Sequence, residues 1–557
     1  MDLADWFLTA AERGNPATRL DSRHPDGAAW TTGNEVRPLI HGKPYFAELL
    51  SRVRALDAGD LLLFTDWRGD PDQWLADAGP AVSTAFCEAA RRGVHVRGLI
   101  WRSHLDRFRF SGQENRHLGE DVDAAGGQCL LDMRVRPGGS HHMKLVVLRH
   151  ASRPERDVAF VGGIDLCHSR RDDAAHHGDP QRQPMAAVYG HRPPWHDVQL
   201  MIQGPAVGDV ETVFRERWED PAPLTRNPLA RLHDLLQHVD EDARRLPPQQ
   251  PGPPRCGHHA VQVLRTYPYR RPGYRFAPQG ERSIARAYHK VLPRARSLIY
   301  LEDQYLWSAT VAGVLAGALA ANPALYLIAV LPAFPDQDGR LSLPPNLLGR
   351  VAALEALRAA GGDRVAAYSL ENAAGVPIYV HAKVCVVDDT WAIVGSDNFN
   401  RRSWTHDSEL SCAVIDEAGQ PGHRARPAGG SPVDGISPDG LNGVPLTGGP
   451  AGSGAKPTGA GPFPRALRIA LAREHLGAAA DSADDPGAGA FAAFRRAAQA
   501  LDAWYAGGRH GPRPPGQLRG YPTPRLSSWT RAWASVPYRL IYDPDGRPLS
   551  WRRAGRF

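Results

Sequence analysis

Two short strings that pair a histidine with a lysine are the clearest sign of chemistry in this chain of 557 residues. His142-x-Lys144 recurs as His381-x-Lys383, and each string runs into a β-branched stretch. Because side chains two residues apart on a strand share a face, each histidine is expected beside its lysine. A neutral imidazole can attack phosphorus when cations neutralise the non-bridging oxygens. The duplicated string therefore predicts phosphodiester chemistry at one site built from both copies.

The two histidines would divide the work of a double displacement. One imidazole attacks and forms a covalent phosphoenzyme, while the other donates a proton to the leaving oxygen and then deprotonates water. Opposite protonation states require different surroundings, which a carboxylate paired with each ring can supply. Asp197 and Asp407 are the candidates, since each follows a histidine that opens an alternating strand in its half. Glu409, on the same strand face as Asp407, is the alternative.

A glycine-rich turn with a polar residue follows each string, at residues 162–165 and 395–398. The groups expected to hold the equatorial phosphoryl oxygens are Lys144, Lys383, Ser396 and Asn398. Gly163 and Asp165 occupy the matching turn of the first half and are supporting candidates. Glu302 and Gln304 are expected at the edge of the site, where they pack the interface between halves. This arrangement requires no metal and no other cofactor.

The duplication extends well beyond the catalytic strings. Residues 61–67 have a counterpart in residues 298–304, and the spacing between matched positions stays near about 235 residues. Past residue 162 the spacing becomes shorter. We interpret the polar segment 170–194 as a loop inserted in the first copy, which accounts for the difference. Two copies of one folding unit are therefore predicted.

Strand and helix patterns alternate within each copy. The expected helices are 44–56, 80–92, 283–292, 310–321, 466–476 and 491–505, and the expected strands are 61–67, 94–101, 298–301 and 325–331. Such alternation predicts an α/β fold with a mixed or parallel sheet covered on both faces. The predicted organisation is an N-terminal extension (1–34), a first repeat (35–245), a proline-rich linker (246–258), a second repeat (259–416), a Gly/Pro-rich insert without order (417–464) and a C-terminal helical tail that packs on the second repeat (465–557).

Composition describes an ordinary globular protein and narrows its partners. Hydrophobic residues make up 42% and charged residues 23% of the chain, and the net charge of +6 suits an anionic substrate without the concentrated basic stripes of a nucleic-acid binder. The N-terminus lacks the pattern of a secretory signal, and the six cysteines show no pairing rhythm, so a cytoplasmic or membrane-peripheral location is expected. Cys167-His168 and His176-His177 suggest a metal site, but their spacing fits no tight ligand set, so these residues are interpreted as part of a polar loop.

The second half fits a complete family pattern. His381, Lys383 and Asp388 form His-x-Lys-x4-Asp, and Ser396 and Asn398 complete Gly-Ser-x-Asn. This combination resembles the phospholipase D superfamily of HKD-motif phosphodiesterases. Segments 160–167, 195–197 and 301–305 look like the eukaryotic-type phospholipases D. The resemblance covers roughly residues 33–416 and resumes at residues 466–477.

The resemblance implies a fold and an activity. It implies two α/β/α sandwich repeats with pseudo-two-fold symmetry and one shared site, with His142 as nucleophile, His381 as acid/base and Asp388 as part of the catalytic motif. The implied reaction is hydrolysis of glycerophospholipid to phosphatidic acid and a free head group, or transfer to an alcohol, at a transiently bound membrane surface. The alternatives are a nuclease or other phosphodiesterase of the same superfamily, and a lipid- or phosphate-binding relative without turnover. Nothing in the chain points to a protein partner.

The first half departs from the family pattern. Arg149 stands five residues after Lys144, where the pattern has aspartate. Either Asp157 fills that place across a longer loop, or the first half lacks the supporting carboxylate.

Overall fold

A computed structural model describes residues 2–103, 112–236, 242–417, 462–477, 483–554 and 557 of the chain. The insert expected at residues 417–464 falls almost entirely outside these ranges, so the expectation that it lacks order concerns residues that the structure does not describe.

The first repeat is built on one mixed sheet. Its strands are β1 (Thr31–Ile40), β2 (Leu61–Asp66), β3 (His95–Trp101), β4 (Gln128–Asp132), β5 (Leu145–Arg149), β6 (Val158–Gly162) and β8 (Val198–Gln203). They pair in the order β4-β3-β2-β5-β6-β8-β1, in which β2, β3 and β4 are mutually parallel and the other neighbours antiparallel.

The second repeat reproduces this sheet. Its strands are β9 (His259–Tyr267), β11 (Leu298–Glu302), β12 (Tyr326–Val330), β13 (Val365–Glu371), β15 (Val384–Val387), β16 (Trp391–Gly395) and β17 (Glu409–Asp416), joined by the short strands β10 (Glu281–Arg282), β14 (Pro377–Val380) and β18 (Leu518–Gly520). The order β13-β12-β11-β15-β16-β17-β9 matches the first sheet strand for strand, parallel and antiparallel pairs included. The predicted α/β fold with two mixed-sheet repeats is confirmed.

Helices cover both faces of each sheet. The first half contains α1 (Leu3–Trp6), α2 (Ala10–Arg13), α3 (Gly42–Arg54), α4 (Val82–Arg91), α5 (Gly112–Ala124), α6 (Ala206–Trp218) and α7 (Pro228–Leu236). The second half contains α8 (Ser283–Val291), α9 (Ala309–Ala321), α10 (Leu343–Gly361), α11 (Arg401–Thr405), α12 (Phe463–Leu476), α13 (Ala488–Ala506), α14 (Ser528–Pro537) and α15 (Leu549–Arg553). The helices expected from sequence end within three residues of these bounds.

Three apolar cores follow from the alternation of side chains along the strands. One face of the first sheet packs on α3, α4 and α5, and the corresponding face of the second sheet packs on α8, α9 and α10. The opposite faces meet in a third core together with α6, α12 and α13. Helix α12, which follows the insert, therefore takes the place in the second repeat that α6 takes in the first.

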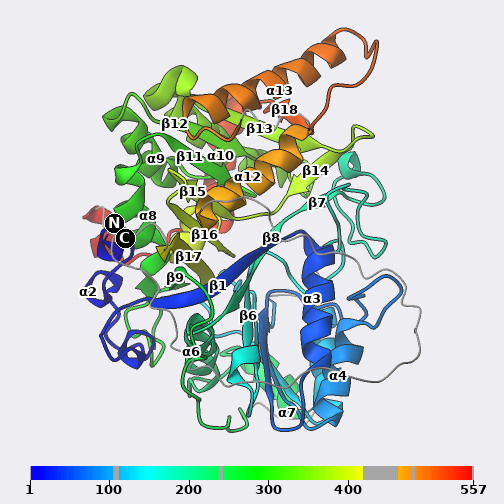
Figure 1. The fold of residues 1–557 in the computed structure, drawn as a ribbon, viewed down its shortest axis with the longest axis vertical. Coiled ribbons are helices and arrows are strands. Elements are labelled where there is room, and N and C mark those ends of the chain that lie inside the picture. Colours follow the sequence, from blue (N-terminus) through cyan, green and yellow to red (C-terminus); the bar gives the residue numbers. More distant parts are fainter. Residues whose placement is uncertain (1, 104–111, 237–241, 418–461, 478–482, 555–556) are drawn as a thin grey trace, which may run out of the picture.

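The two sheets meet edge to edge. Strands β1 and β9 are antiparallel neighbours, with Thr31 opposite Val261 and Asn34 opposite His259. Figure 1 shows the first repeat in the lower half and the second in the upper half, with β1, β8, β9 and β17 where they join. The ends of β5 and β15 that carry the two His-x-Lys strings point toward this junction, which brings the strings together.

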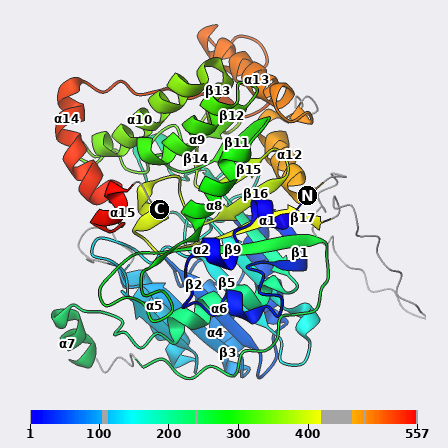
Figure 2. The same cartoon turned by 90° about the vertical axis from the view of Figure 1, so that its left-hand side faces the viewer.

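The C-terminal tail was expected to pack on the second repeat, and its last helices lie outside the sheet of that repeat. Helix α14 packs on α10, so it is separated from the sheet by a helix layer (Figure 2). Its apolar residues include Trp529, which is 77% exposed. Within the described residues, no helix is long and apolar enough to cross a membrane.

Candidate active site

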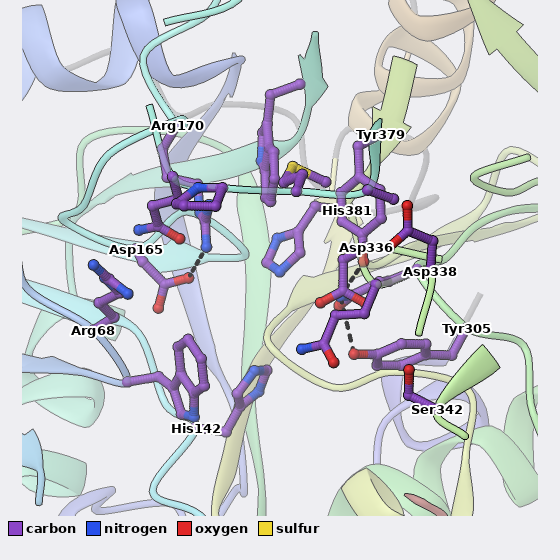
Figure 3. Close-up of a pocket in the computed structure, with 18 of the residues that line it drawn as sticks. Arg68, His142, Asp165, Arg170, Tyr305, Asp336, Asp338, Ser342, Tyr379 and His381 are labelled. Carbon is purple, nitrogen blue, oxygen red and sulfur yellow. Dashed lines mark hydrogen bonds and ion pairs between the residues drawn. The ribbon is translucent and has the colours of Figure 1, made fainter. Parts of the chain in front are cut away.

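A cavity of about 990 Å³ lies between the repeats and contains both histidines of the His-x-Lys strings. First-repeat residues Arg68, Asp165 and Arg170 face second-repeat residues Tyr305, Asp336 and Tyr379 across it, with His142 and His381 between them (Figure 3). Residues 183–186 of the segment inserted in the first repeat and residues 336–339 and 342 of the second repeat also line it. The two histidines therefore lie in one cavity, as a site shared by the two repeats requires.

His142 is held by the second repeat. Its backbone N–H donates to the carbonyl of Ser408 over 2.9 Å, and its Nδ1 lies 2.9 Å from Oε2 of Glu409. With Nδ1 committed to a carboxylate, Nε2 is the ring nitrogen left for chemistry.

His381 is held by the first repeat in the same way. Its backbone N–H donates to the carbonyl of His196 over 2.8 Å, and its Nδ1 lies 2.7 Å from Oδ2 of Asp197. The strand that leads into it, β14, runs parallel to the short strand β7 (Trp195–His196). Each repeat thus supplies one imidazole and the carboxylate that orients the other repeat's imidazole.

The prediction that Asp407 orients a histidine is wrong, and the strand register explains why. Gly162 stands opposite Gln199, and its counterpart Gly395 stands opposite Ser411. The residue equivalent to Asp197 is therefore Glu409, and matching the two His-Asp dipeptides shifted the alignment by two positions. Asp407 instead forms an ion pair with Arg402 at 2.6 Å and accepts a hydrogen bond from the backbone of Ser140 at 2.8 Å.

The two lysines lie beside their histidines, as the two-residue spacing indicates. The Nζ of Lys144 lies 3.1 Å from Oδ1 of Asp165, and that of Lys383 donates to Oε1 of Gln304 over 3.1 Å. Each lysine also donates to the carbonyl of the histidine in its own string. Both are almost completely buried. Their charges are therefore fixed in a site of low dielectric, where they act strongly on an anion.

Of the turn residues of the second half, Ser396 is placed differently from the prediction. Ser396 donates to Glu409 over 2.6 Å and accepts from the backbone of Leu410, so it anchors the carboxylate and its hydroxyl is already committed. Gly163 is its counterpart, and a Cβ there would lie 2.2 Å from Oδ1 of Asp197. The glycine makes room for the carboxylate. Asn398 is buried, and its Oδ1 lacks a hydrogen-bond partner among the described residues.

Asp388 lies away from the reacting groups, contrary to its assignment as a catalytic residue. It sits at a φ of 51° in the turn after β15. Its carboxylate accepts from the backbone N–H groups of Arg296, Ser297 and Leu298 over 2.7, 2.8 and 3.0 Å. Asp388 thus fixes the start of β11, and its effect on the site is indirect.

The first repeat stabilises the corresponding turn and strand without an aspartate at the position equivalent to Asp388. Asp60, at the start of β2, accepts from the backbone of Ala151 over 2.8 Å. Asp157 pairs with Arg149 at 2.7 Å, and Arg149 also pairs with Glu211 of α6. Of the two alternatives left by the sequence, the second holds: Asp157 supports Arg149 and does not take the place of Asp388.

Glu302 packs the interface between the repeats, as expected, and Gln304 lines the cavity there. Oε2 of Glu302 lies 2.7 Å from Nε2 of His196, a first-repeat residue. Gln304 lines the cavity and donates to the hydroxyl of Tyr379 over 2.8 Å. Gln304 therefore connects Lys383 to the cavity wall.

Sequence reasoning missed several residues that line the cavity. The Arg170 guanidinium lies 3.9 Å from the ring centroid of Trp195 and 3.4 Å from Asp165, so a cation is held over the cavity by an aromatic face. Trp67 makes an edge contact with His142 at 6.2 Å between centroids. The repeat aligns Trp67 with Gln304, and this alignment could have indicated that Trp67 lies at the site. Arg170 had no such signal, because the inserted segment that carries it has no counterpart.

Burial and the lysine charges depress the pKa of both histidines. Burial comes first for each ring, followed by Lys144 and Lys383 for His142 and by Lys383 and Arg170 for His381. Burial likewise raises the pKa of Asp197 and, with Asp407 contributing, raises the pKa of Glu409 to about 8. An arriving phosphodiester would offset the cationic charge and so favour protonation of one imidazole.

Both His-x-Lys strings lie in segments that match models of known protein families. The family model described as phospholipase D matches residues 123–312, and that described as cardiolipin synthase, PLD-like domain, matches residues 353–420. Phospholipase D alpha 1 of Cynara cardunculus is 26% identical over 495 aligned positions, which cover 66% of this chain and 60% of that protein. These matches show that the chain is similar to proteins of the phospholipase D superfamily.

A further curated relative and one solved structure show comparable likeness to this chain. Phospholipase D alpha 1 of Arabidopsis thaliana is 27% identical, with 58% of this chain and 53% of that protein covered. The chain thus spans a little over half the length of the curated relatives it matches. Among solved structures, phosphatidylserine synthase of Haemophilus influenzae Rd KW20 covers 69% of this chain and 82% of its own, with a TM-score of 0.46 and 11% identity.

Proposed function

We propose that the chain is a phospholipase D-type phosphodiesterase that hydrolyses glycerophospholipid to phosphatidic acid and a free head group. With an alcohol in place of water, the same site would transfer the phosphatidyl group. The observation that carries this proposal is the pair of imidazoles in one cavity, each with Nδ1 against a carboxylate from the other repeat.

The proposed reaction proceeds in two displacements. Nε2 of His142 attacks phosphorus, the bond to the head-group oxygen breaks, and Nε2–H of His381 gives its proton to that oxygen. His381 then takes a proton from water, whose oxygen attacks phosphorus and releases His142. Glu409 and Asp197 stabilise the positive charge that each ring carries in turn.

The cations of the site suit this chemistry because the transferred group is anionic throughout. The ammonium groups of Lys144 and Lys383 are buried and held in place by hydrogen bonds, so they are oriented before the substrate arrives. Preorganised donors of this kind each contribute roughly 10²–10³-fold in rate.

Replacing Lys383 with methionine tests the proposal. The variant removes one buried cation with little change in side-chain volume, and we expect kcat on phosphatidylcholine vesicles to fall by roughly 10²–10³-fold while the fold is retained. Choline release and, in ethanol, phosphatidylethanol formation are the readouts. Lys43→Met is the matched control, because that lysine is 46% exposed on the surface.

Two outcomes would overturn the assignment. Full choline release by a folded Lys383→Met variant would move the site elsewhere. Cleavage of an oligonucleotide in a parallel assay, with strong salt dependence and no lipid turnover, would place the substrate among nucleic acids.

A further inference from the structure

A second cluster of chemically active side chains lies behind His381, outside the cavity. Four residues come together there from four separate segments: His41 before α3, His176 in the inserted segment, His196 in β7 and Glu474 in α12. The three histidines are fully buried, and the side chain of Glu474 is 9% exposed. The phosphodiesterase chemistry uses none of these side chains directly.

The ligand atoms of the cluster lie close together around the carboxylate of Glu474. One nitrogen from each ring and a carboxylate oxygen all lie within 4.8 Å of one another. Nε2 of His41 lies 2.8 Å from Oε2 of Glu474, while Nε2 of His176 and Nδ1 of His196 lie 3.0 and 3.1 Å from its Oε1. Ligands around a tetrahedral ion with bonds near 2.0–2.1 Å stand about 3.3 Å apart, so only small side-chain shifts separate this arrangement from a coordination sphere.

In two of the three imidazoles, the nitrogen that faces away from the cluster has the partner that a metal-bound ring requires, whereas Nδ1 of His41 lacks a hydrogen-bond partner among the described residues. Nδ1 of His176 lies 3.1 Å from the carbonyl oxygen of Trp195. Nε2 of His196 lies 2.7 Å from Glu302, whose other oxygen lies 2.8 Å from Nε2 of His475. Imidazole ligands nearly always donate their remaining N–H to a carbonyl or carboxylate, which fixes the tautomer that points a lone pair at the ion.

We propose that His41, His176, His196 and Glu474 bind one divalent transition-metal ion of the zinc class. Three imidazoles and a carboxylate favour zinc over calcium or magnesium, which prefer oxygen ligands. Four protein ligands in a buried position leave no open coordination place for substrate. The ion is therefore structural.

The ion would stabilise the orientation of the catalytic pair. The backbone N–H of His41 donates to the carbonyl of Asp197 over 2.9 Å, and the carbonyl of His196 accepts from His381 and Ala382. A bond from the ion to each ligand would thus tie α12 and the inserted segment to the strand that presents Asp197. Loss of the ion would loosen the His381–Asp197 pair without removing either residue.

A metal-free hydrogen-bond network is the competing interpretation of the same atoms. In that state His196 contacts a carboxylate with each nitrogen, so its ring must carry two protons and a positive charge. A zinc ion would supply that charge in place of the proton.

Metal analysis of the untagged, full-length protein separates the two interpretations. After dialysis against chelator and reloading with zinc, we expect about one zinc per chain, a rise in Tm on reloading, and a visible d–d spectrum of tetrahedral geometry with Co²⁺. Glu474→Gln and His176→Gln should each lower bound zinc by at least tenfold. The matched control is His258→Gln, taken from the more exposed group of His258, His259 and Asp416, and it should keep its zinc.

The outcome decides the proposal independently of lipid turnover. Wild-type protein that takes up no zinc at saturating concentration, with an unchanged Tm, overturns it even if either variant fails to fold. Zinc that is retained in the two ligand variants but lost in His258→Gln also overturns it, since the ion would then occupy the surface group.

Discussion

Two carboxylates orient the imidazoles of the site. Asp197 and Glu409 each hold Nδ1 of one histidine, and each comes from the repeat opposite to that histidine. Glu409 is in turn fixed by Ser396, while Asp197 is accommodated by the absence of a side chain at Gly163. The two imidazoles therefore have similar geometry but different supports, as unequal roles in a double displacement require.

Replacing Glu409 with glutamine should separate the two carboxylate candidates of the second repeat. Glutamine cannot stabilise an imidazolium, so we expect kcat to fall by roughly 10²–10⁴-fold. Asp407→Asn, which affects the ion pair with Arg402, should leave kcat within about threefold. Steady-state kinetics on one phospholipid measures both. Equal losses of kcat in the two variants would contradict the assignment, from the strand register, of Glu409 as the residue that orients His142.

The alkaline limb of the pH profile should report Lys383. Burial lowers the pKa of Lys383 to about 8, so its ammonium form is present below that pH and is lost above it. Only the ammonium form neutralises phosphate, and kcat/KM, which reflects the free enzyme, should therefore fall as pH rises through about 8. The limb should persist in Glu409→Gln, which removes the other site group with a pKa near 8. A profile that stays flat to pH 10 in both proteins would exclude Lys383 as the titrating group.

At the scale of elements, matched strands explain why two distant strings share a cavity. Strands β5 and β15 occupy the same position in sheets of identical order, and both lead away from the junction between repeats. The turn after β15 is held by Asp388, whereas the first repeat uses Asp60 and the Arg149–Asp157 ion pair. The motif aspartate thus has a structural task that different residues can perform.

Replacing Asp388 with alanine should therefore lower stability more than chemistry. The change leaves several backbone N–H groups without acceptors and should reduce the free energy of unfolding by about 2–4 kcal/mol. The kcat of the folded fraction should stay within about threefold of wild type. Asp388→Asn tolerates the positive φ and keeps one acceptor, so it should lose less. Denaturant titration together with kinetics provides the measurement. A stable Asp388→Ala variant without turnover would restore a catalytic role.

Sequence alone predicted the paired histidines and lysines because strand periodicity and repetition are local signals. It could not predict which acid orients His142, because the dipeptide His406-Asp407 imitates His196-Asp197 while the register aligns Glu409 with Asp197. Arg170 and His176 were not predicted as site residues for another reason. Their segment is inserted, so neither the repeat nor local spacing indicates what the fold places beside it.

Considered as a whole, the molecule closes one cavity with parts from both repeats. The backbone of Ala186, in the first repeat's inserted segment, donates to the carbonyl of Asp336 in the second repeat over 2.7 Å. Beside this contact, Phe334 and Leu341 are 41% and 80% exposed. An apolar rim at the mouth of a polar cavity is what an enzyme acting on lipid in a membrane surface would use.

Replacing Leu341 with aspartate should weaken action on membranes selectively. We expect the turnover of phosphatidylcholine vesicles to fall by roughly fivefold to tenfold, because apolar contact with the bilayer is lost. Turnover of a short-chain, monomeric phosphatidylcholine should stay unchanged. Leu235→Asp on α7, at a leucine that is 73% exposed, is the matched control and should affect neither substrate. Parallel losses on both substrates would mean that Leu341 acts on the cavity itself.

The central claim is that imidazoles from two repeats carry out one phosphoryl transfer, and trapping the intermediate tests it most directly. Rapid acid-free quenching during turnover, followed by peptide mass spectrometry, should find the phosphatidyl group on one ring, His142, in the wild type. With a substrate whose leaving group needs no proton, such as phosphatidyl-p-nitrophenol, it should accumulate in His381→Asn, where water is no longer activated. An adduct on neither His142 nor His381 during full turnover would contradict the account.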